Sequence, residues 1–233
     1  MKYMKSISIL SIALLFLASW TKFTDATTAV VVNLKFSSSK GMNGTVKIYY
    51  DTPGTRIEMN ATTTSGYSVN RVSLVKKSSP DTVFTIDDKT KTYSTADVSR
   101  AETDQNTDPA TATFIDTTTI NGYHCKHCKV VQGDKNWETW TTAAITEYEQ
   151  MSAVMNKQKY IGNHGLHIAL KAINAEGFPV KLIETDKDGT STTELESVEH
   201  KVLDASLFAI PAGYTKGAAG WPMGGGNYPH PGH

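Results

Sequence analysis

The segment His124–Cys128 (His-Cys-Lys-His-Cys) concentrates four side chains that could bind a metal ion or take part in thiol chemistry. A tetrahedral zinc site requires that its ligands converge on one point. The surrounding residues predict an extended strand, in which neighbouring side chains point to opposite faces. Cys125 and His127 would then share one face, and His124 and Cys128 the other. These four side chains do not close around one ion by themselves, so a metal site would need a second pair of ligands.

The sequence leaves two roles for this segment open, a metal site and a disulfide. His230 and His233 near the C-terminus are the available second pair of metal ligands. A disulfide between Cys125 and Cys128 is favoured by an oxidising compartment. Three residues of strand span roughly 10 Å, however, and a disulfide needs Cα atoms within about 7 Å. A bond between the two cysteines would therefore require a bulge or a tight turn between them, and a thioredoxin-like role would require a helix N-terminus there.

No other set of residues in the sequence demands a reaction. The run His164-Gly165-Leu166-His167 lacks the glutamate and the four-residue spacing of a zinc-protease helix. The chain has no Gly-x-Ser-x-Gly element and no glycine-rich phosphate loop that follows a strand. We therefore expect no catalytic residue, no enzyme activity and no cofactor.

A stripe of apolar residues is the second candidate site. Thr146 and Glu149 form the Ser/Thr-x-x-Glu pattern of a helix start, and the pattern predicts a helix that runs to about Lys159. Its apolar stripe consists of Tyr148, Met151, Val154 and Met155. Such a stripe packs against a core in most helices. It is also a candidate ligand lining, because methionine is flexible and suits irregular apolar ligands.

The elements that must position these residues are mostly strands. Apolar and polar residues alternate along the chain, so that Val30, Val32, Leu34 and Phe36 share one face. Turn residues such as Asp51-Thr52-Pro53-Gly54 separate the alternating segments. This arrangement predicts an antiparallel meander. The expected strands cover residues 30–36, 46–50, 56–60, 72–74, 83–86, 92–93, 113–120, 123–131, 136–142, 178–185 and 192–202.

Several segments interrupt the meander. Residues 97–112 are polar and predict a long exposed loop. Leu166–Ile173 fits a short helix or a strand, and we favour the strand. Asp186–Gly189 predicts a turn between the last two strands, and Asp204–Phe208 a helical turn that ends at Pro211. From Gly217 onward the chain is rich in Gly and Pro, which predicts a disordered tail.

The N-terminal residues predict export. Lys2 and Lys5 precede an apolar run from Ile7 to Ala18, and small residues follow near Ala26. This is the layout of a secretory signal peptide, and the run is shorter than the roughly 20 residues needed to span a bilayer. We expect cleavage after residue 26 and a mature chain that is secreted or periplasmic, with no transmembrane segment.

The charge balance excludes one class of partner. The chain has 23 Lys+Arg and 23 Asp+Glu, and residues 1–26 hold three lysines and one aspartate, which leaves 20 basic and 22 acidic residues. The mature chain therefore has no basic excess, and a nucleic acid is not an expected partner.

Four motifs occur in an order that resembles a known family. They are Gly122-Tyr123-His124-Cys125, the run Trp137–Thr142, Gly177-Phe178-Pro179-Val180 and the closing segment Asp204–Tyr214. This order resembles an uncharacterised family of secreted bacterial proteins, domain of unknown function 4412, over roughly residues 28–216. The resemblance implies the shape of the periplasmic lipoprotein carriers: an unclosed, curved antiparallel sheet with helices over its concave face, where carriers hold acyl chains. It implies no catalytic residue, and it leads us to expect an aromatic residue in relatives at the position of Cys128.

Together these observations predict a mainly β fold with one or two helices (α+β). A signal peptide (1–26) precedes a single half-barrel domain (27–216) and a disordered tail (217–233). We expect a non-catalytic protein that binds or carries an apolar ligand, such as a lipid or a lipoprotein acyl chain. Two alternatives are an extracytoplasmic metal-binding or thiol-redox protein that uses His124–Cys128, and a structural envelope protein with a packed core.

Overall fold

The computed structural model describes residues 29–99, 108–155 and 164–217, and these residues form one twisted sheet with short helices on one side. The helical elements are α1 (Tyr148–Met155), α2 (His164–Ala172) and the 3-10 helix η1 (Ala205–Phe208). The strands are β1 (Ala29–Ser38), β2 (Met42–Asp51), β3 (Gly54–Thr63), β4 (Ser68–Lys76), β5 (Ser79–Asp87), β6 (Thr92–Asp97), β7 (Thr111–Ile120), β8 (Tyr123–Gln132), β9 (Lys135–Thr142), β10 (Phe178–Asp186), β11 (Gly189–Lys201) and β12 (Thr215–Lys216).

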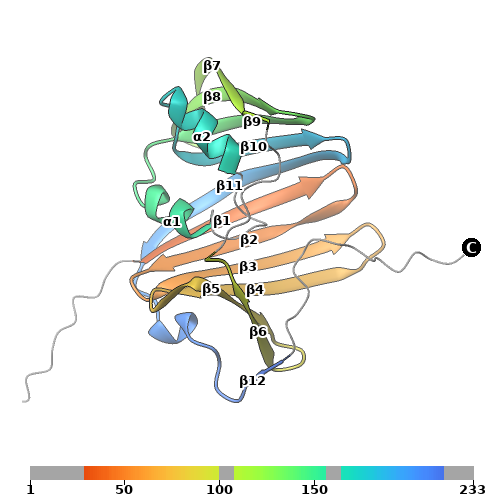
Figure 1. Ribbon diagram of the computed structural model, residues 1–233, viewed down its shortest axis with the longest axis vertical. Coiled ribbons are helices and arrows are strands. Elements are labelled where there is room, and N and C mark those ends of the chain that lie inside the picture. Colours follow the sequence, from red (N-terminus) through yellow and green to blue (C-terminus); the bar gives the residue numbers. More distant parts are fainter. Residues whose placement is uncertain (1–28, 100–107, 156–163, 218–233) are drawn as a thin grey trace, which may run out of the picture.

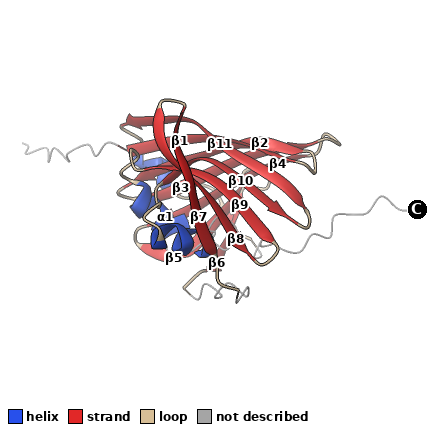
Figure 2. Ribbon diagram, turned by 90° about the horizontal axis from the view of Figure 1, so that it is seen from above, coloured by secondary structure: helices blue, strands red, loops and turns tan. Residues whose placement is uncertain are grey.

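The sheet is open and almost wholly antiparallel. Its strand order is β12-β6-β5-β4-β3-β2-β1-β11-β10-β9-β8-β7, and β7 and β12 do not pair with each other. The two-residue strand β12 pairs with β6 in parallel. Figure 2 shows the strands curving around the side on which both helices lie. The predicted unclosed, curved antiparallel sheet with helices over its concave face is confirmed.

Strand β1 joins two meanders that are far apart in sequence. Along one edge it pairs with β2, and along the other with β11, where Val32 lies opposite Val198. Asn33 on β1 donates a hydrogen bond to Ser197, 164 residues away. A bulge between Asn33 and Leu34 lets β11 carry one extra residue there, which increases the local twist of the paired strands.

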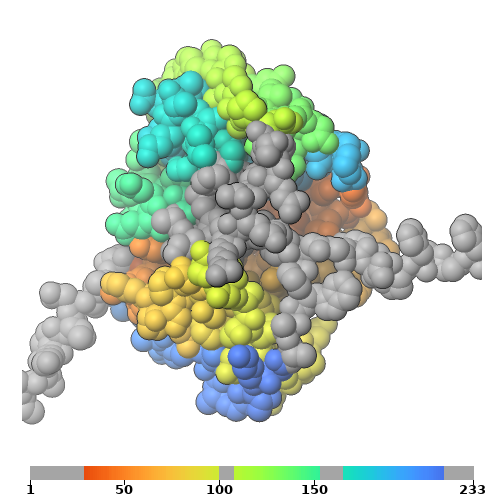
Figure 3. All heavy atoms as spheres, in the orientation of Figure 1, coloured from red at the N-terminus to blue at the C-terminus, as the bar shows by residue number. Residues whose placement is uncertain are grey.

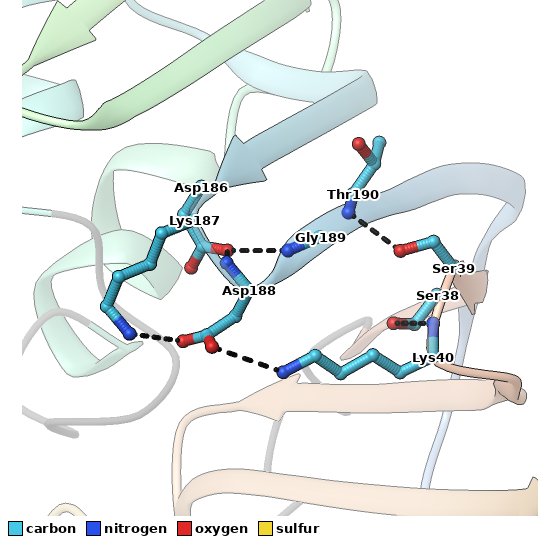
Figure 4. Close-up of polar contacts among 8 residues, drawn as sticks. All are labelled: Ser38, Ser39, Lys40, Asp186, Lys187, Asp188, Gly189 and Thr190. Carbon is cyan, nitrogen blue, oxygen red and sulfur yellow. Dashed lines mark hydrogen bonds and ion pairs between the residues drawn. The ribbon is translucent and has the colours of Figure 1, made fainter.

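The turn between β10 and β11 shows why the chain reverses where the sequence predicted (Figure 4). The Asp186 carboxylate accepts hydrogen bonds from the backbone N–H groups of Asp188 and Gly189 at 2.8 and 3.0 Å. Gly189 has a φ of +142°, and a Cβ there would lie 2.4 Å from the hydroxyl oxygen of Ser39. That hydroxyl accepts a hydrogen bond from the Thr190 N–H. Glycine is therefore required where the β10–β11 turn meets the β1–β2 turn.

The predicted strand over Leu166–Ile173 is wrong, because His164–Ala172 form helix α2. Leu166, Ala169 and Leu170 are buried, at the i, i+3 and i+4 spacing of one helical face. They pack against Val130 and other residues of a core cluster on the sheet. A short apolar run fits both periods, and the sheet surface beneath it decides between them.

The remaining element predictions, except for the end of one loop, agree with the described residues as far as these extend. Helix α1 is described to Met155, so its predicted end near Lys159 lies outside the described residues. The predicted helical turn is confirmed as η1, in which the Asp204 side chain accepts a hydrogen bond from the Ser206 N–H. The signal peptide, residues 100–107 of the predicted 97–112 loop and all of the predicted tail except Gly217 also lie outside the described residues. The predicted loop is too long at its end, because Thr111 and Ala112 pair with β8 as the start of β7.

The core lies between the helices and the concave face of the sheet. One cluster joins β1, β2, β10 and β11 to α1 through buried residues such as Val32, Ile48, Met151 and Phe178. A second joins β8 and β9 to α2 and includes Trp137. In Figure 3 the helices (green to teal) and strand β5 (yellow) lie on the same face of the molecule. No helix among the described residues is long and apolar enough to cross a membrane.

Candidate functional site

Helix α1 is held on the concave face by two of the residues predicted to line a ligand site. The Met151 side chain is completely buried among Val30, Ile48 and their neighbours. The Tyr148 ring meets the Phe178 ring edge to face, with centroids 5.7 Å apart and an interplanar angle of 79°. Burial raises the pKa of the Tyr148 phenol above its usual value. Both side chains therefore anchor α1 to the sheet.

The two other predicted lining residues, Val154 and Met155, belong to the last turn of α1. Their side chains lie outside the described residues. Their proposed contact with a ligand stays a prediction.

A hollow with a volume of about 430 Å³ lies beside the first turn of α1. The buried residues Val30, Thr55 and Val75 line its inner part. Its other lining residues are Tyr50, Asp51, Thr52, Gly54, Lys76, Lys77, Pro80, Glu147 and Gln150, which come from the strand ends, the β2–β3 and β4–β5 turns and the start of α1. The hollow thus has apolar groups inside and polar groups toward its mouth.

Polar contacts tie the start of α1 to the strands around this hollow. The Tyr50 hydroxyl donates a hydrogen bond to the Gln150 side chain at 2.7 Å. Burial, with the charges of Asp51 and Glu147, raises the pKa of Tyr50. Glu147 lies 3.0 Å from the His200 ring. Burial opposes ionisation of Glu147, but hydrogen bonds from its own N–H and from His200 outweigh it and lower its pKa.

A second hollow, with a volume of about 100 Å³, lies on the other side of α1. Tyr148 and Ser152 of α1 and Leu166 and Leu170 of α2 form its roof. Its remaining lining residues are Leu34, Ile48, Thr139, Thr141, His167, Gly177, Phe178, Pro179 and Leu182, most of them from the sheet. Helix α1 therefore lies between two hollows, and the space between helix and sheet is incompletely filled by the described side chains.

The structure does not bring the His124–Cys128 residues together as one site. Cys125 and Cys128 are both free and completely buried. Cys125 belongs to the cluster around Phe178, whereas Cys128 belongs to the cluster around Trp137. Burial raises the pKa of both thiols, and for Cys128 the charge of Lys126 opposes that increase. Two buried thiols with raised pKa values are poor nucleophiles and poor metal ligands.

His127 contacts carboxylate and aromatic side chains of the neighbouring strands. Its ring nitrogens lie 3.2 Å from the Asp116 carboxylate and 2.8 Å from the Glu138 carboxylate. The ring stacks on Trp140, with centroids 4.3 Å apart, and the Lys181 ammonium lies 5.5 Å from the centre of the Trp140 ring on the next strand. These residues occupy neighbouring positions of β7, β8, β9 and β10.

The same ladder continues to β1 through Glu194, which lies 3.1 Å from both Lys35 and Lys181. These residues alternate with ones that face the helices, so the ladder lies on the opposite face of the sheet. The sequence does not predict this ladder, because the neighbours of a residue on adjacent strands follow only from the strand register. Within the described ranges, no group of three or more His, Cys, Asp or Glu side chains is arranged to hold a metal ion.

Comparison with known proteins identifies a family for most of the chain. A family model described as "Domain of unknown function (DUF4412)" matches residues 30–214. A search of curated proteins finds no match. The predicted family resemblance is therefore confirmed by a match that extends from β1 to the end of the closing segment.

Solved structures show weaker similarity. PNGF-II is 16% identical, with a TM-score of 0.41, over 83% of this chain and 31% of that one. MucB in complex with MucA(peri) is 8% identical, with a TM-score of 0.42, over 77% of this chain and 53% of that one. The hypothetical protein CT021 from Chlamydia trachomatis is 11% identical, with a TM-score of 0.34, over 77% of this chain and 90% of that one. This chain thus spans about a third of the length of PNGF-II, and at such scores the function must be inferred from the site itself.

Proposed function

The chain belongs to the DUF4412 family, and from this premise we propose that it is an exported, non-catalytic protein that binds an apolar ligand beside helix α1. The proposed ligand is a lipid or a lipoprotein acyl chain, held on the concave face of the sheet. The observation that carries this proposal is the pair of hollows on the two sides of α1.

The size and lining of the larger hollow support a small-molecule site. Ligand pockets commonly have volumes of about 300–1,000 Å³ and are lined mostly by apolar groups, with a few polar groups that orient the ligand. The larger hollow, with a volume of about 430 Å³, falls in this range. Val30 and Val75 offer its inner part an apolar surface, while Tyr50 and Gln150 stand at its edge.

Two of the charged residues that line the larger hollow already contact other side chains, which favours a ligand whose buried part is uncharged. Glu147 is paired with His200. The Lys76 ammonium lies 4.9 Å from the centre of the Phe84 ring, which occupies the other face of β5. Charges already paired elsewhere offer little to an ionic group. An acyl chain in the hollow, with its polar end left at the mouth, fits this arrangement.

The smaller hollow supports a role for α1 as a cover. Among the described side chains of α1, Met151 and Tyr148 pack against the sheet. A shift of α1 along the sheet would join the two hollows into one longer channel. Such a shift would require the Met151 and Tyr148 side chains to exchange their contacts on the sheet.

Native mass spectrometry of the delipidated full chain, incubated with a lipid extract, tests this function. We expect acyl lipids to be retained by the wild-type protein. Gln150→Trp places an indole at the mouth of the larger hollow and should weaken binding by about tenfold or more, because it occupies space that the ligand needs. Glu149→Trp is the matched control, because Glu149 is exposed on the same helix and lines neither hollow.

Three results would contradict the proposal. One is a wild-type protein that stays free of lipid at every lipid concentration. Another is a Gln150→Trp variant that binds as tightly as the wild type. The third is equal loss of binding in both tryptophan variants at an unchanged melting temperature, because the ligand would then contact the outer side of α1 instead of the hollow.

A further inference from the structure

No strand of the described ranges pairs with the outer edge of β7. Among the described residues β7 is the last strand of the sheet and pairs only with β8. Eight of its ten residues are exposed. The strand therefore presents a row of backbone N–H and C=O groups that can pair with another strand.

The opposite edge of the sheet, at β6, is partly covered by another strand. There the short strand β12 covers part of β6, and the N–H groups of Thr215 and Gly217 donate to the carbonyls of Lys91 and Tyr93 at 3.2 and 2.9 Å. Proteins commonly blunt an edge with such short strands, with lysine or with proline. Strand β7 (Thr-Ala-Thr-Phe-Ile-Asp-Thr-Thr-Thr-Ile) contains neither lysine nor proline.

The side chains of β7 suit pairing with an identical strand. Thr117, Thr118 and Thr119 are exposed and follow a bulge at Ile115. Threonine favours strands, and threonine pairs across strands are stabilising. Asp116 is the only charged residue of β7, and its carboxylate lies 3.2 Å from a ring nitrogen of His127. A second copy of this edge would thus meet one carboxylate and no cationic side chain on β7.

We propose that two copies of this protein associate through antiparallel pairing of their β7 strands, with a two-fold axis at Thr118. In this register Thr117 of each copy lies opposite Thr119 of the other, and Asp116 lies opposite Ile120. The two Asp116 side chains are then about four residues, or roughly 13 Å, apart along the strands. An axis at the bulge would bring these two carboxylates close together.

Phe114 and Ile115 are 50% and 48% exposed. In this register they lie beyond Ile120, where the partner's β7 ends, because Asn121 and Gly122 turn the chain onto β8. The paired segment is therefore Asp116–Ile120 of each copy. The edge is short, and a standard stable interface buries about 800 Å² per partner, so the dimer forms at high protein concentration.

Sedimentation equilibrium of the full chain at several concentrations tests the proposal without reference to any lipid. We expect a monomer–dimer equilibrium that Thr118→Lys weakens by at least about tenfold, because two ammonium groups would face each other at the axis. Thr118→Val is the matched control and should keep the dimer, since it preserves a β-branched side chain. Both variants should melt at the wild-type temperature, because residue 118 is exposed.

Cross-linking tests the register. Thr118→Cys should form an intermolecular disulfide under mild oxidation, because the same residue meets itself at a two-fold axis. Thr113→Cys, exposed on the same strand but away from the axis, should not. The proposal is overturned by a protein that stays monomeric at all concentrations, by a dimer that Thr118→Lys leaves unchanged, or by equal cross-linking at the two positions.

Discussion

Glu184 shows how burial on the concave face changes the ionisation of a carboxyl group. It lies on β10 opposite Trp137, and its pKa is raised mainly by burial, with Lys135 opposing and Asp186 adding to the increase. A raised pKa in the folded state means that the neutral carboxyl is favoured there. Its contribution to stability is present below the unfolded pKa of about 4.3 and is lost as pH rises through the folded pKa.

We therefore expect Glu184→Gln to melt at a higher temperature than the wild type at neutral pH, with the advantage disappearing in acid. Glu194→Gln is the control, because we expect its effect on stability to depend on pH in the opposite direction. Lys35 and Lys181 lower the pKa of Glu194, so its contribution is present above the unfolded pKa and is lost as pH falls. Thermal melts between about pH 4 and pH 8 check both variants. The same pH dependence in the two variants would contradict this assignment.

The two cysteines give a second prediction at the residue scale. Both thiols are free, buried and of raised pKa. In the native protein we expect their alkylation to be at least about a hundredfold slower than in the denatured chain, because thiolate formation and access are both suppressed.

Thiol counting by mass spectrometry, with and without reductant, provides the measurement, and metal analysis of the same sample accompanies it. Two alkylated cysteines in the unreduced, denatured chain and no bound metal are expected. A disulfide between Cys125 and Cys128, or a stoichiometric metal ion, would instead favour the metal-binding or thiol-redox alternative.

At the scale of elements, the stability of helix α1 depends on burial of the Met151 side chain more than on the length of the helix. Most of the stability of a helix in a protein comes from packing of its apolar face and not from its intrinsic propensity. Met151 is fully buried, whereas Ile168 on α2 is 52% exposed. We expect Met151→Ala to lower the free energy of unfolding by about 2–5 kcal/mol. Ile168→Ala should change it by less than about 0.5 kcal/mol.

Chemical denaturation measures both free energies. Equal effects of the two alanine substitutions would show that α1 is not held to the sheet as the structure indicates. A large effect of Met151→Ala on ligand retention, without a change in stability, would mean that this side chain contacts the ligand and is not an anchor.

At the scale of the whole molecule, one continuous sheet carries both proposals on different parts. The concave face holds the helices and the two hollows, and the outer edge of β7 faces solvent. Pairing of two β7 edges would extend the sheet without covering α1. Ligand binding and self-association can therefore be tested independently of each other.

The local elements could be predicted from short stretches of the sequence. Alternation and turn residues placed most strands and the β10–β11 turn, because pairing within a hairpin depends on neighbours in the chain. The motif order also identified the family, which the match over residues 30–214 confirms. The apolar stripe around Met151 and the Cys125–Cys128 pair could be recognised as candidate site residues, since residue types and their spacing can be read directly from the sequence.

Features that depend on contacts between distant residues followed from the fold and not from the sequence pattern. Leu166–Ile173 became a helix because the sheet beneath it buries Leu166, Ala169 and Leu170 together. The pairing of β1 with β11, the ladder from Lys35 to His127 and the positions of the two hollows arise from residues far apart in the chain. Short-range patterns carry no information on which distant strand completes a sheet, and for that reason the site emerged only from the fold.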